Sequence, residues 1–369
     1  MISKPLLQAI DPEHLTEAFR RAGVLGNAQV ADVVVESSRA TILSQITRLH
    51  LAYDSDAPDA PRSVILKTGH PDRLEDGWGG GCQEVAFYTQ VASVAPGRFA
   101  PRCLEAHGDE ETKTWHLLLE DLTDTHVVAA SWPLPPTMER SAAIVEALAQ
   151  FHARWWDNPR LCKSVGAWAN AAATTRYLEN LAEKFEQFTN RLGDNLPRER
   201  CRLYEQLLDA APRLLERHHT RRNLTIVHGD LHVLNSFLPR DGGDDVRFLD
   251  CDSWRIGAAS ADLAYMMAIH WYPDRRARLE RPLLDRYHAT LTSHGVDGYD
   301  RHALEDDYRL SVLWHITTPV HQAAYNIPPV IWWNNLERVF LAVDDLGCRD
   351  LVSRANGSFR SCGLTATGG

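Results

Sequence analysis

The sequence lacks the residue patterns that mark several large classes of protein. It has seven cysteines, at positions 82, 103, 162, 201, 251, 348 and 362, but no CxxC pair, so neither a zinc site nor a disulfide framework is indicated. The first residues contain no apolar stretch of signal-peptide length, and no later segment approaches about 18 uninterrupted apolar residues. We therefore expect free thiols, a cytoplasmic location and no membrane partner.

Positive charge is also scarce. The chain carries 39 Lys and Arg against 49 Asp and Glu, which gives a formal net charge of −10 at pH 7. The mixed basic run at 217–222 is too short to form a nucleic-acid surface, because neutralising phosphates needs clustered Lys and Arg. We expect no nucleic-acid partner, and the charge balance favours a cationic or neutral small molecule.

The remaining composition is typical of a globular protein. The 369 residues are 44% hydrophobic and 24% charged, and this length suits two lobes or one large domain. The sequence leaves open whether the protein is a monomer or a homodimer.

Residues 11–22 have the apolar spacing of a short helix, and strand-like runs follow at 30–37, 40–54 and 63–68. Three antiparallel strands are the simplest interpretation. The third run reads VILK and ends near Lys67, similar to the V-A-I-K strand whose lysine pairs with nucleotide phosphates in protein kinases. A lysine at the end of a strand is, however, usually just solvated.

A helix is predicted just after the glycine-rich loop at 76–82, and Glu84 stands in its first turn. In kinases the first helix after the lysine strand supplies a glutamate that pairs with that lysine. Glu84 is therefore the candidate partner of Lys67. The alternative is a glutamate that is favoured near a helix N-terminus by the helix dipole.

Two further strands are predicted at 101–109 and 114–122, and the second ends in LLLEDL. In a two-lobed kinase this segment would be the hinge, whose backbone groups bond the adenine edge, so Glu120 and Leu122 are candidate nucleotide contacts. The rest of the chain is expected to be mainly helical, at 137–156, 170–193, 199–218, 261–272, 280–294, 301–324 and 331–346.

The most informative stretch reads HGDLHVLN, followed after a Gly- and Asp-rich turn by VRFLDCD. Asp230 and Asn235 are five residues apart, and Asp250 follows fifteen residues later. Kinase-type phosphoryl transfer uses this order: one Asp orients the attacking hydroxyl, while an Asn and a later Asp hold magnesium on the nucleotide phosphates. Asp230 is thus the candidate catalytic base. Asn235 and Asp250 are candidate ligands of Mg²⁺, which prefers oxygen donors.

Other residues of this stretch have competing interpretations. Asp252 could replace Asp250 as the metal ligand, although Asp250 directly follows the apolar strand. Asp262 is better explained as a helix cap or a brace for the loop than as a catalytic group. His232 is better explained by packing than by metal ligation, because no second His or Cys lies at ligand spacing.

These motifs, with QEVAFY, ALAQFHARWW and the late IWWNNLERVF, resemble the aminoglycoside phosphotransferase and choline kinase superfamily, most closely its bacterial ecdysteroid-kinase-like branch. The resemblance covers roughly residues 30 to 350. It implies an α+β, two-lobed protein-kinase-like fold, with a β-rich nucleotide lobe at 1–121 and a helical catalytic and acceptor-binding lobe at 122–369. It also implies a kinase that uses ATP and Mg²⁺ to phosphorylate a hydroxyl of a small molecule.

One feature departs from that pattern. The turn that should cover the phosphates, expected at 36–41, reads ESSRAT and has no glycine, which leaves a kinase-like binding module without catalysis as an alternative. The acceptor itself is not determined. The acidic run at 305–307 could receive a cationic acceptor and the Trp pairs at 155–156 and 332–333 an apolar one, but a solvated helix face and packing between helices are the simpler explanations.

Overall fold

The protein is described here by a computed structural model covering residues 9–70, 80–94, 98–109, 111–112, 114–131, 134–168 and 170–361. The chain forms two compact units. Unit 1 comprises Met1–Leu134 with Val233–Trp254, and unit 2 comprises Pro135–His232 with Arg255–Gly369. The lobes expected at 1–121 and 122–369 were defined by their roles in nucleotide binding and in catalysis, and this division stays a prediction. Most of the glycine-rich loop at 76–82 lies outside the described residues.

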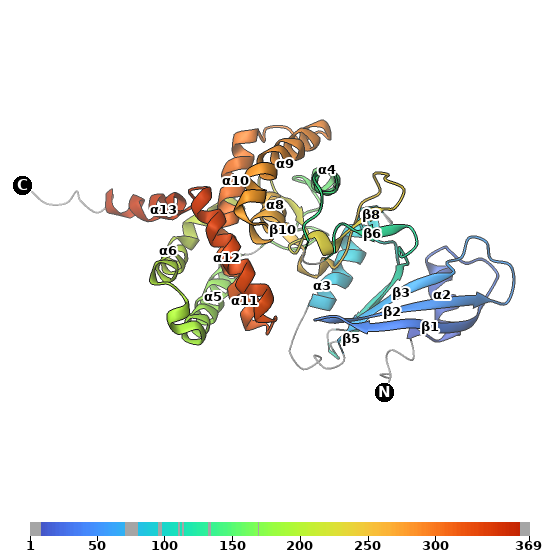
Figure 1. Ribbon diagram of the computed structural model, residues 1–369. Helices are drawn as coiled ribbons and strands as arrows, with labels where there is room; N and C mark the ends of the chain where they lie inside the picture. The colour runs from blue at the N-terminus through green and yellow to red at the C-terminus, as the bar shows by residue number, and fades with distance from the viewer. Residues whose placement is uncertain are drawn as a thin grey trace, which may run out of the picture. The chain divides into compact units, whose positions relative to one another are not determined.

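Unit 1 contains the expected five-stranded antiparallel sheet, in the order β1-β2-β3-β5-β4. Figure 1 labels β1, β2, β3 and β5 of this sheet. The strands are β1 (Val30–Ala40), β2 (Ser44–Tyr53), β3 (Ser63–Gly69), β4 (Cys103–Asp109) and β5 (Thr114–Glu120). Two helices accompany them, α2 (Pro12–Arg21) and α3 (Gly80–Ala86), and α3 continues into a π-helical turn, η2 (Phe87–Val91), and a short 3-10 turn, η3 (Ala92–Val94).

The two faces of this sheet carry different side chains. Helix α2 packs its apolar residues Leu15 and Phe19 into one core with Leu66 and Leu118 of the sheet. Adjacent residues of a strand point to opposite faces, so Lys67 lies on the face away from α2. Helix α3 contacts β4, β5 and the short helix η6 (Cys251–Ser253). The fold therefore separates the α2 core from the face that bears Lys67.

The hairpin between the first two strands differs from the sequence prediction. Residues 36–40, expected in the turn, belong to β1, and the chain reverses at 41–43. The Thr41 amide donates to the carbonyl of Ser44 at 2.7 Å, and the Thr41 hydroxyl donates to the same oxygen at 3.0 Å. The prediction was wrong because the polar ESSRA segment looked like a turn, whereas its side chains lie along an exposed edge strand.

A smaller sheet in unit 1 connects the two halves of the central sequence stretch. Its order is β6-β8-β9, formed by β6 (His126–Val128), β8 (Ser236–Pro239) and β9 (Arg247–Phe248). The 3-10 turn η5 (Val233–Asn235) precedes β8, and the amide of Leu249 donates to the carbonyl of Asn235 at 2.9 Å. This pairing keeps the chain around Asn235 next to the chain that leads into Asp250.

Unit 2 is mainly helical, as the periodicity predicts. Its helical segments are α4 (Met138–Trp155), α5 (Ala171–Leu192), η4 (Gly193–Asn195), α6 (Arg198–Leu214), α7 (Glu216–His219), α8 (Ser260–Ala264), η7 (Tyr265–Ile269), α9 (Pro273–Ser293), α10 (Arg301–Trp314), η8 (His315–Thr317), α11 (Thr318–Ala324), α12 (Pro329–Asp345) and α13 (Arg349–Ser361). The strands β7 (Thr225–Val227) and β10 (Arg255–Gly257) pair antiparallel. Among the described residues, no helix has the length and apolar character needed to cross a membrane.

Helix α4 shows why the sequence folds locally as it does. The side chain of Thr137 caps it by accepting from the amide of Arg140. Its apolar residues recur at helical spacing, so Ile144, Leu148 and Phe151 are buried together on one side.

Candidate active site

Lys67, on β3, is the centre of an ion cluster in unit 1. Its Nζ lies 2.5 Å from Oε2 of Glu84, on α3, and 2.6 Å from Oδ1 of Asp250. The Lys67 and Glu84 side chains are only 7% and 2% exposed, whereas that of Asp250 is 43% exposed. The pairing of Glu84 with Lys67 predicted from the sequence is present. Helix α3 begins at Gly80, so Glu84 is past its first turn and the helix dipole does not account for its position.

The electrostatics of the cluster keep Lys67 charged. Burial by itself would lower the pKa of Lys67, but the negative charges of Asp250 and Glu84 outweigh it and raise that pKa above its ordinary value. A buried ammonium group in contact with two carboxylates is a fixed positive charge, which suits it to a phosphate.

Asp250 has an unusual backbone conformation. Its φ of 62° and ψ of 52° lie in the left-handed region, which costs a residue with a Cβ about 1 kcal/mol or more. It stands directly before η6, and Cys251 after it is buried. The other candidate acid, Asp252, accepts from the hydroxyl of Ser253 at 2.9 Å. In this conformation Asp250 contacts Lys67.

Asn235 is the second predicted metal ligand, and it is 7% exposed. It shares unit 1 with Asp250, and the Leu249 amide ties the two segments together. Asn235 and Asp250 therefore belong to one compact unit although fifteen residues separate them.

The predicted base, Asp230, lies in unit 2, in the loop that follows β7. Its amide donates to Nδ1 of His228 at 3.3 Å, and its Oδ2 lies 3.7 Å from Nε2 of His232. The Asp230 side chain is 28% exposed. Gly229 has a φ of 86°, which a residue with a Cβ rarely adopts, so glycine allows the loop to turn before Asp230.

Asp262 supports this loop through hydrogen bonds to its backbone. Its carboxylate is fully buried and accepts from the amides of His228 at 2.7 Å and Gly229 at 2.8 Å. This confirms the interpretation of Asp262 as a brace; it is the third residue of α8, not a helix cap. Burial by itself would raise the pKa of Asp262, but hydrogen bonding and the nearby His152 lower it, so the carboxylate stays charged.

His152 is a residue that sequence reasoning missed. It lies on the buried side of α4, where its Nε2 is 3.1 Å from Oδ2 of Asp262 and its Nδ1 is 2.7 Å from the hydroxyl of Tyr287. Since a carboxylate only accepts, Nε2 donates to Asp262, and Nδ1 shares a hydrogen bond with the hydroxyl of Tyr287. A histidine within an otherwise apolar helix face is the signal that could have found it.

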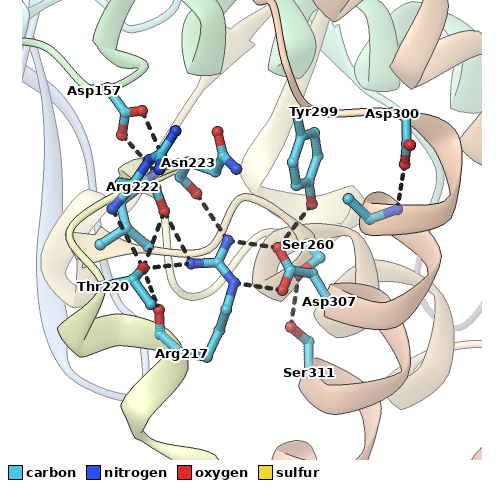
Figure 2. Close-up of polar contacts among 12 residues, drawn as sticks. Asp157, Arg217, Thr220, Arg222, Asn223, Ser260, Tyr299, Asp300, Asp307 and Ser311 are labelled. Atoms are coloured by element: carbon cyan, nitrogen blue, oxygen red, sulfur yellow. Dashed lines mark hydrogen bonds and ion pairs between the residues drawn. The ribbon is translucent and has the colours of Figure 1, made fainter.

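A second brace holds the chain that leads into β7, and Figure 2 shows its contacts. Arg217 makes a bidentate pair with Asp307, with Nε to Oδ1 and Nη2 to Oδ2 both at 2.7 Å (Figure 2). The hydroxyl of Tyr299 donates to the same carboxylate at 2.9 Å. Arg217 also donates to the carbonyls of Arg222 at 3.0 Å and Asn223 at 3.1 Å. The first residue of the basic run is therefore a structural cation.

Asp157, from the end of α4, completes this brace. Its two carboxylate oxygens accept from the amides of Asn223 and Leu224, each at 2.9 Å (Figure 2). Both backbone groups immediately precede β7, the strand that presents the His228 loop. Arg217 and Asp157 together fix where that loop begins.

The predicted hinge residues have structural partners. Glu120 ends β5, and its Oε2 accepts from the amide of Arg102 at 3.0 Å and lies 3.2 Å from Nη1 of Arg247. Leu122 is buried, and its carbonyl accepts from the amide of His126 at 2.9 Å. Their contact with a nucleotide stays a prediction.

The acidic run at 305–307 is occupied by internal partners. Asp307 pairs with Arg217, Asp306 lies 3.2 Å from His302, and Glu305 lies 3.6 Å from Arg301. Glu305 and Asp306 are 63% and 60% exposed, as expected for a solvated helix face, whereas Asp307 is buried against Arg217 and departs from that expectation. The Trp155 and Trp332 side chains are 2% and 3% exposed, which agrees with packing between helices.

Two solved structures share the fold of this chain. A protein from Ralstonia eutropha JMP134, provisionally described as an aminoglycoside phosphotransferase, aligns with 92% of this chain and 98% of its own, with a TM-score of 0.57 and 15% identity. Choline kinase from Cryptosporidium parvum Iowa II aligns with 88% of this chain and 93% of its own, with a TM-score of 0.54 and 11% identity. No curated protein sequence matches the chain. The fold is the expected α+β, two-lobed protein-kinase-like fold.

The class defined by this fold and family is that of phosphotransferases with an alcohol group as acceptor. The profile of the ecdysteroid kinase-like family matches residues 40–296, which is more than half of the sequence. The chain belongs to the ecdysteroid kinase-like family, and this confirms the resemblance in the central motifs.

Proposed function

We propose that this protein transfers the γ-phosphoryl group of ATP, with Mg²⁺, to a hydroxyl of a small molecule. The observation that carries the proposal is the cluster in which buried Lys67 holds Glu84 and Asp250. A cation enclosed this way contributes little to stability, because the desolvation of the charges offsets their attraction. Its position is better explained by a negatively charged ligand.

On the nucleotide side, Lys67 donates to the α- and β-phosphates, and Glu84 keeps its ammonium group in position. The backbone around Glu120 and Leu122 contacts the adenine. ATP is the nucleotide that the motifs favour, and the proposal places the protein in the cytoplasm, where ATP is available.

The residues present fit a magnesium ion. Asn235 supplies an amide oxygen and Asp250 a carboxylate oxygen, and both are the hard donors that Mg²⁺ requires. The half-exposed Asp250 is accessible to an ion and to its waters. When bound, Mg²⁺ neutralises charge that develops on the transferred phosphate.

On the acceptor side, Asp230 accepts a hydrogen bond from the attacking hydroxyl and takes its proton as the oxygen–phosphorus bond forms and the bond from the γ-phosphorus to the ADP oxygen breaks, so that ADP leaves. Its role depends on position, which Asp262 and Gly229 secure through the backbone of the loop. The acids at 305–307 are paired internally, so they do not argue for a polycationic acceptor.

The test is a phosphate-transfer screen with ATP and Mg²⁺ over aminoglycosides, macrolides, choline-like amines, sterols and sugars. With an acceptor found, Asp230→Ala and Asp250→Ala should each lower kcat by at least ~100-fold. Asp252→Ala is the matched control, since it removes the acid on the other side of Cys251, and it should retain most activity. Full turnover by the Asp230 variant would refute the catalytic assignment.

Binding can be tested separately from turnover. A thermal-shift titration should show stabilisation by ATP with Mg²⁺, and Lys67→Ala should abolish it. Absence of any shift at millimolar nucleotide in the wild type would favour a kinase-like module without catalysis.

A further inference from the structure

A cluster of histidines and one glutamate lies on the α2 side of the unit 1 sheet. His14 is in the first turn of α2, Glu105 is on β4, and His116 is on β5. Nε2 of His14 and Nε2 of His116 lie 2.7 Å and 3.0 Å from the same oxygen, Oε2 of Glu105. The three side chains are 26%, 14% and 15% exposed, so the cluster is shielded but accessible.

The register of the sheet brings two of these residues together. His107 pairs directly with His116 across β4 and β5, and Glu105 is two residues along the same strand, so all three side chains share one face. The His14 side chain reaches the same place because the amide of His14 donates to the cap residue Asp11, which fixes the start of α2. The cluster is thus built on regular elements and not on a loop.

We propose that His14, Glu105 and His116 form a binding site for a divalent transition metal, with Zn²⁺ as the best fit. Each residue offers one ligand atom, and the three atoms lie within 4.8 Å of one another. Ligands of a tetrahedral zinc ion are about 3.3 Å apart. The nitrogens of His14 and His116 therefore have to withdraw from Oε2 by about 0.6 Å and 0.3 Å and to reach the same spacing from each other. A solvent molecule completes the four ligands.

The chemistry of the ligands selects the type of metal. Two imidazoles with one carboxylate suit zinc, nickel or copper, whereas Mg²⁺ and Ca²⁺ prefer oxygen donors only. Glu105 supplies the carboxylate oxygen, Oε2, on which both imidazoles already converge.

Arg21 orients the carboxylate of Glu105 and binds the oxygen that the histidines do not contact. Its Nη2 donates to Oε1 of Glu105 at 2.6 Å, while the histidines converge on Oε2. Outer partners of this kind fix the direction of a ligand. The positive charge of Arg21 opposes a dication, so micromolar binding is expected and not the tightest class of zinc site.

The site is separate from the proposed magnesium site. His116 pairs with Thr68 and faces α2, whereas Lys67 is on the opposite face of β3. A metal ion at the cluster would link α2 to Glu105, which lies 91 residues further along the chain. This cross-link would stabilise unit 1 whether or not phosphate is transferred.

The competing explanation is a hydrogen-bonded cluster in which both histidines donate to Glu105. The test uses the full chain, stripped with a chelator and titrated with ZnCl₂ by calorimetry, without nucleotide. We expect one site that is weakened at least ~100-fold in both His14→Gln and His116→Gln. His302→Gln is the matched control: it lies on an exposed helix face, and its zinc affinity should equal that of the wild type.

A second measurement needs no variant. Zinc at saturating concentration should protect His14 and His116 of the wild type from diethylpyrocarbonate, read by mass spectrometry, and should raise Tm. His302 should react equally with and without zinc. Unchanged modification of His14 and His116, or equal zinc affinity in all variants, would overturn the proposal and leave the hydrogen-bonded cluster as the explanation.

Discussion

Replacing Lys67 by methionine tests how the ion cluster is balanced. The change keeps an unbranched side chain, shortened by one heavy atom, but leaves Glu84, at 2% exposure, as a buried carboxylate without its cation. Removing one partner of a buried pair costs about 3–5 kcal/mol, whereas removing both is often nearly neutral. Asp250 is 43% exposed and is solvated in the variant, so the cost comes mainly from Glu84. We expect Lys67→Met to lose about 3 kcal/mol at pH 8.

The double variant Lys67→Met/Glu84→Gln isolates the cost of the buried Glu84 carboxylate. It contains no uncompensated buried charge, so it should be more stable than Lys67→Met alone by about 2 kcal/mol. Glu84→Gln alone is the other single variant of this double-mutant cycle. It should lose less stability than Lys67→Met, because Lys67 keeps Asp250 as its partner. Both variants should bind nucleotide poorly, which separates stability from function.

The pH dependence of the Lys67→Met penalty tests the reasoning more strictly than its size at a single pH. In the wild type the folded-state pKa of Lys67 is raised, so its contribution to stability is complete below about pH 10 and is lost only above that. In Lys67→Met the lone Glu84 should have a raised folded-state pKa. Its penalty is then small near pH 5, where it takes up a proton, and grows as the pH rises toward 8.

The assay is urea unfolding followed by circular dichroism at pH 5.5 and pH 8, with hydrogen exchange of the β3 amides as a local report on unit 1. A Lys67→Met penalty that is the same at both pH values would refute the reasoning. So would a double variant that is no more stable than Lys67→Met.

Two further predictions concern the braces of unit 2. Asp262→Asn should cost about 3 kcal/mol at neutral pH and lower kcat, because the fully buried carboxylate accepts from two loop amides. Since the folded-state pKa of Asp262 is lowered, its contribution is present above about pH 4 and lost as the pH falls, so urea midpoints of variant and wild type should converge in acid. Arg217→Lys should cost about 1–2 kcal/mol by loss of the bidentate pair, whereas Arg286→Lys at an exposed pair should change stability by less than about 0.5 kcal/mol. An equal loss in both lysine variants, by urea unfolding, would contradict the bracing role of Arg217.

Much of the fold follows from patterns that act over short distances. The period of apolar residues placed β3, β5 and α4 within a few residues of their observed ends. The error at 36–41 arose where a polar edge strand and a turn have the same composition. Such a segment has no apolar face to reveal its period.

The candidate site also has one part that the sequence predicted and one part that it did not. The spacing of Asp230, Asn235 and Asp250 indicated phosphoryl transfer, because a loop and a short hairpin set those positions locally. The left-handed backbone of Asp250 could not be predicted, because no pattern of neighbouring residues marks it.

By itself, then, the sequence determined the class of chemistry, the family and most of the helices and strands, since each of these depends on neighbouring residues. Only the tertiary structure decided that His152 and Asp262 brace the catalytic loop, that Arg217 is buried against Asp307, and that His14 meets Glu105. The physical reason is that these contacts join residues about a hundred positions apart. Their partners are chosen by burial and charge balance in the folded chain, and periodicity and spacing carry no record of that choice.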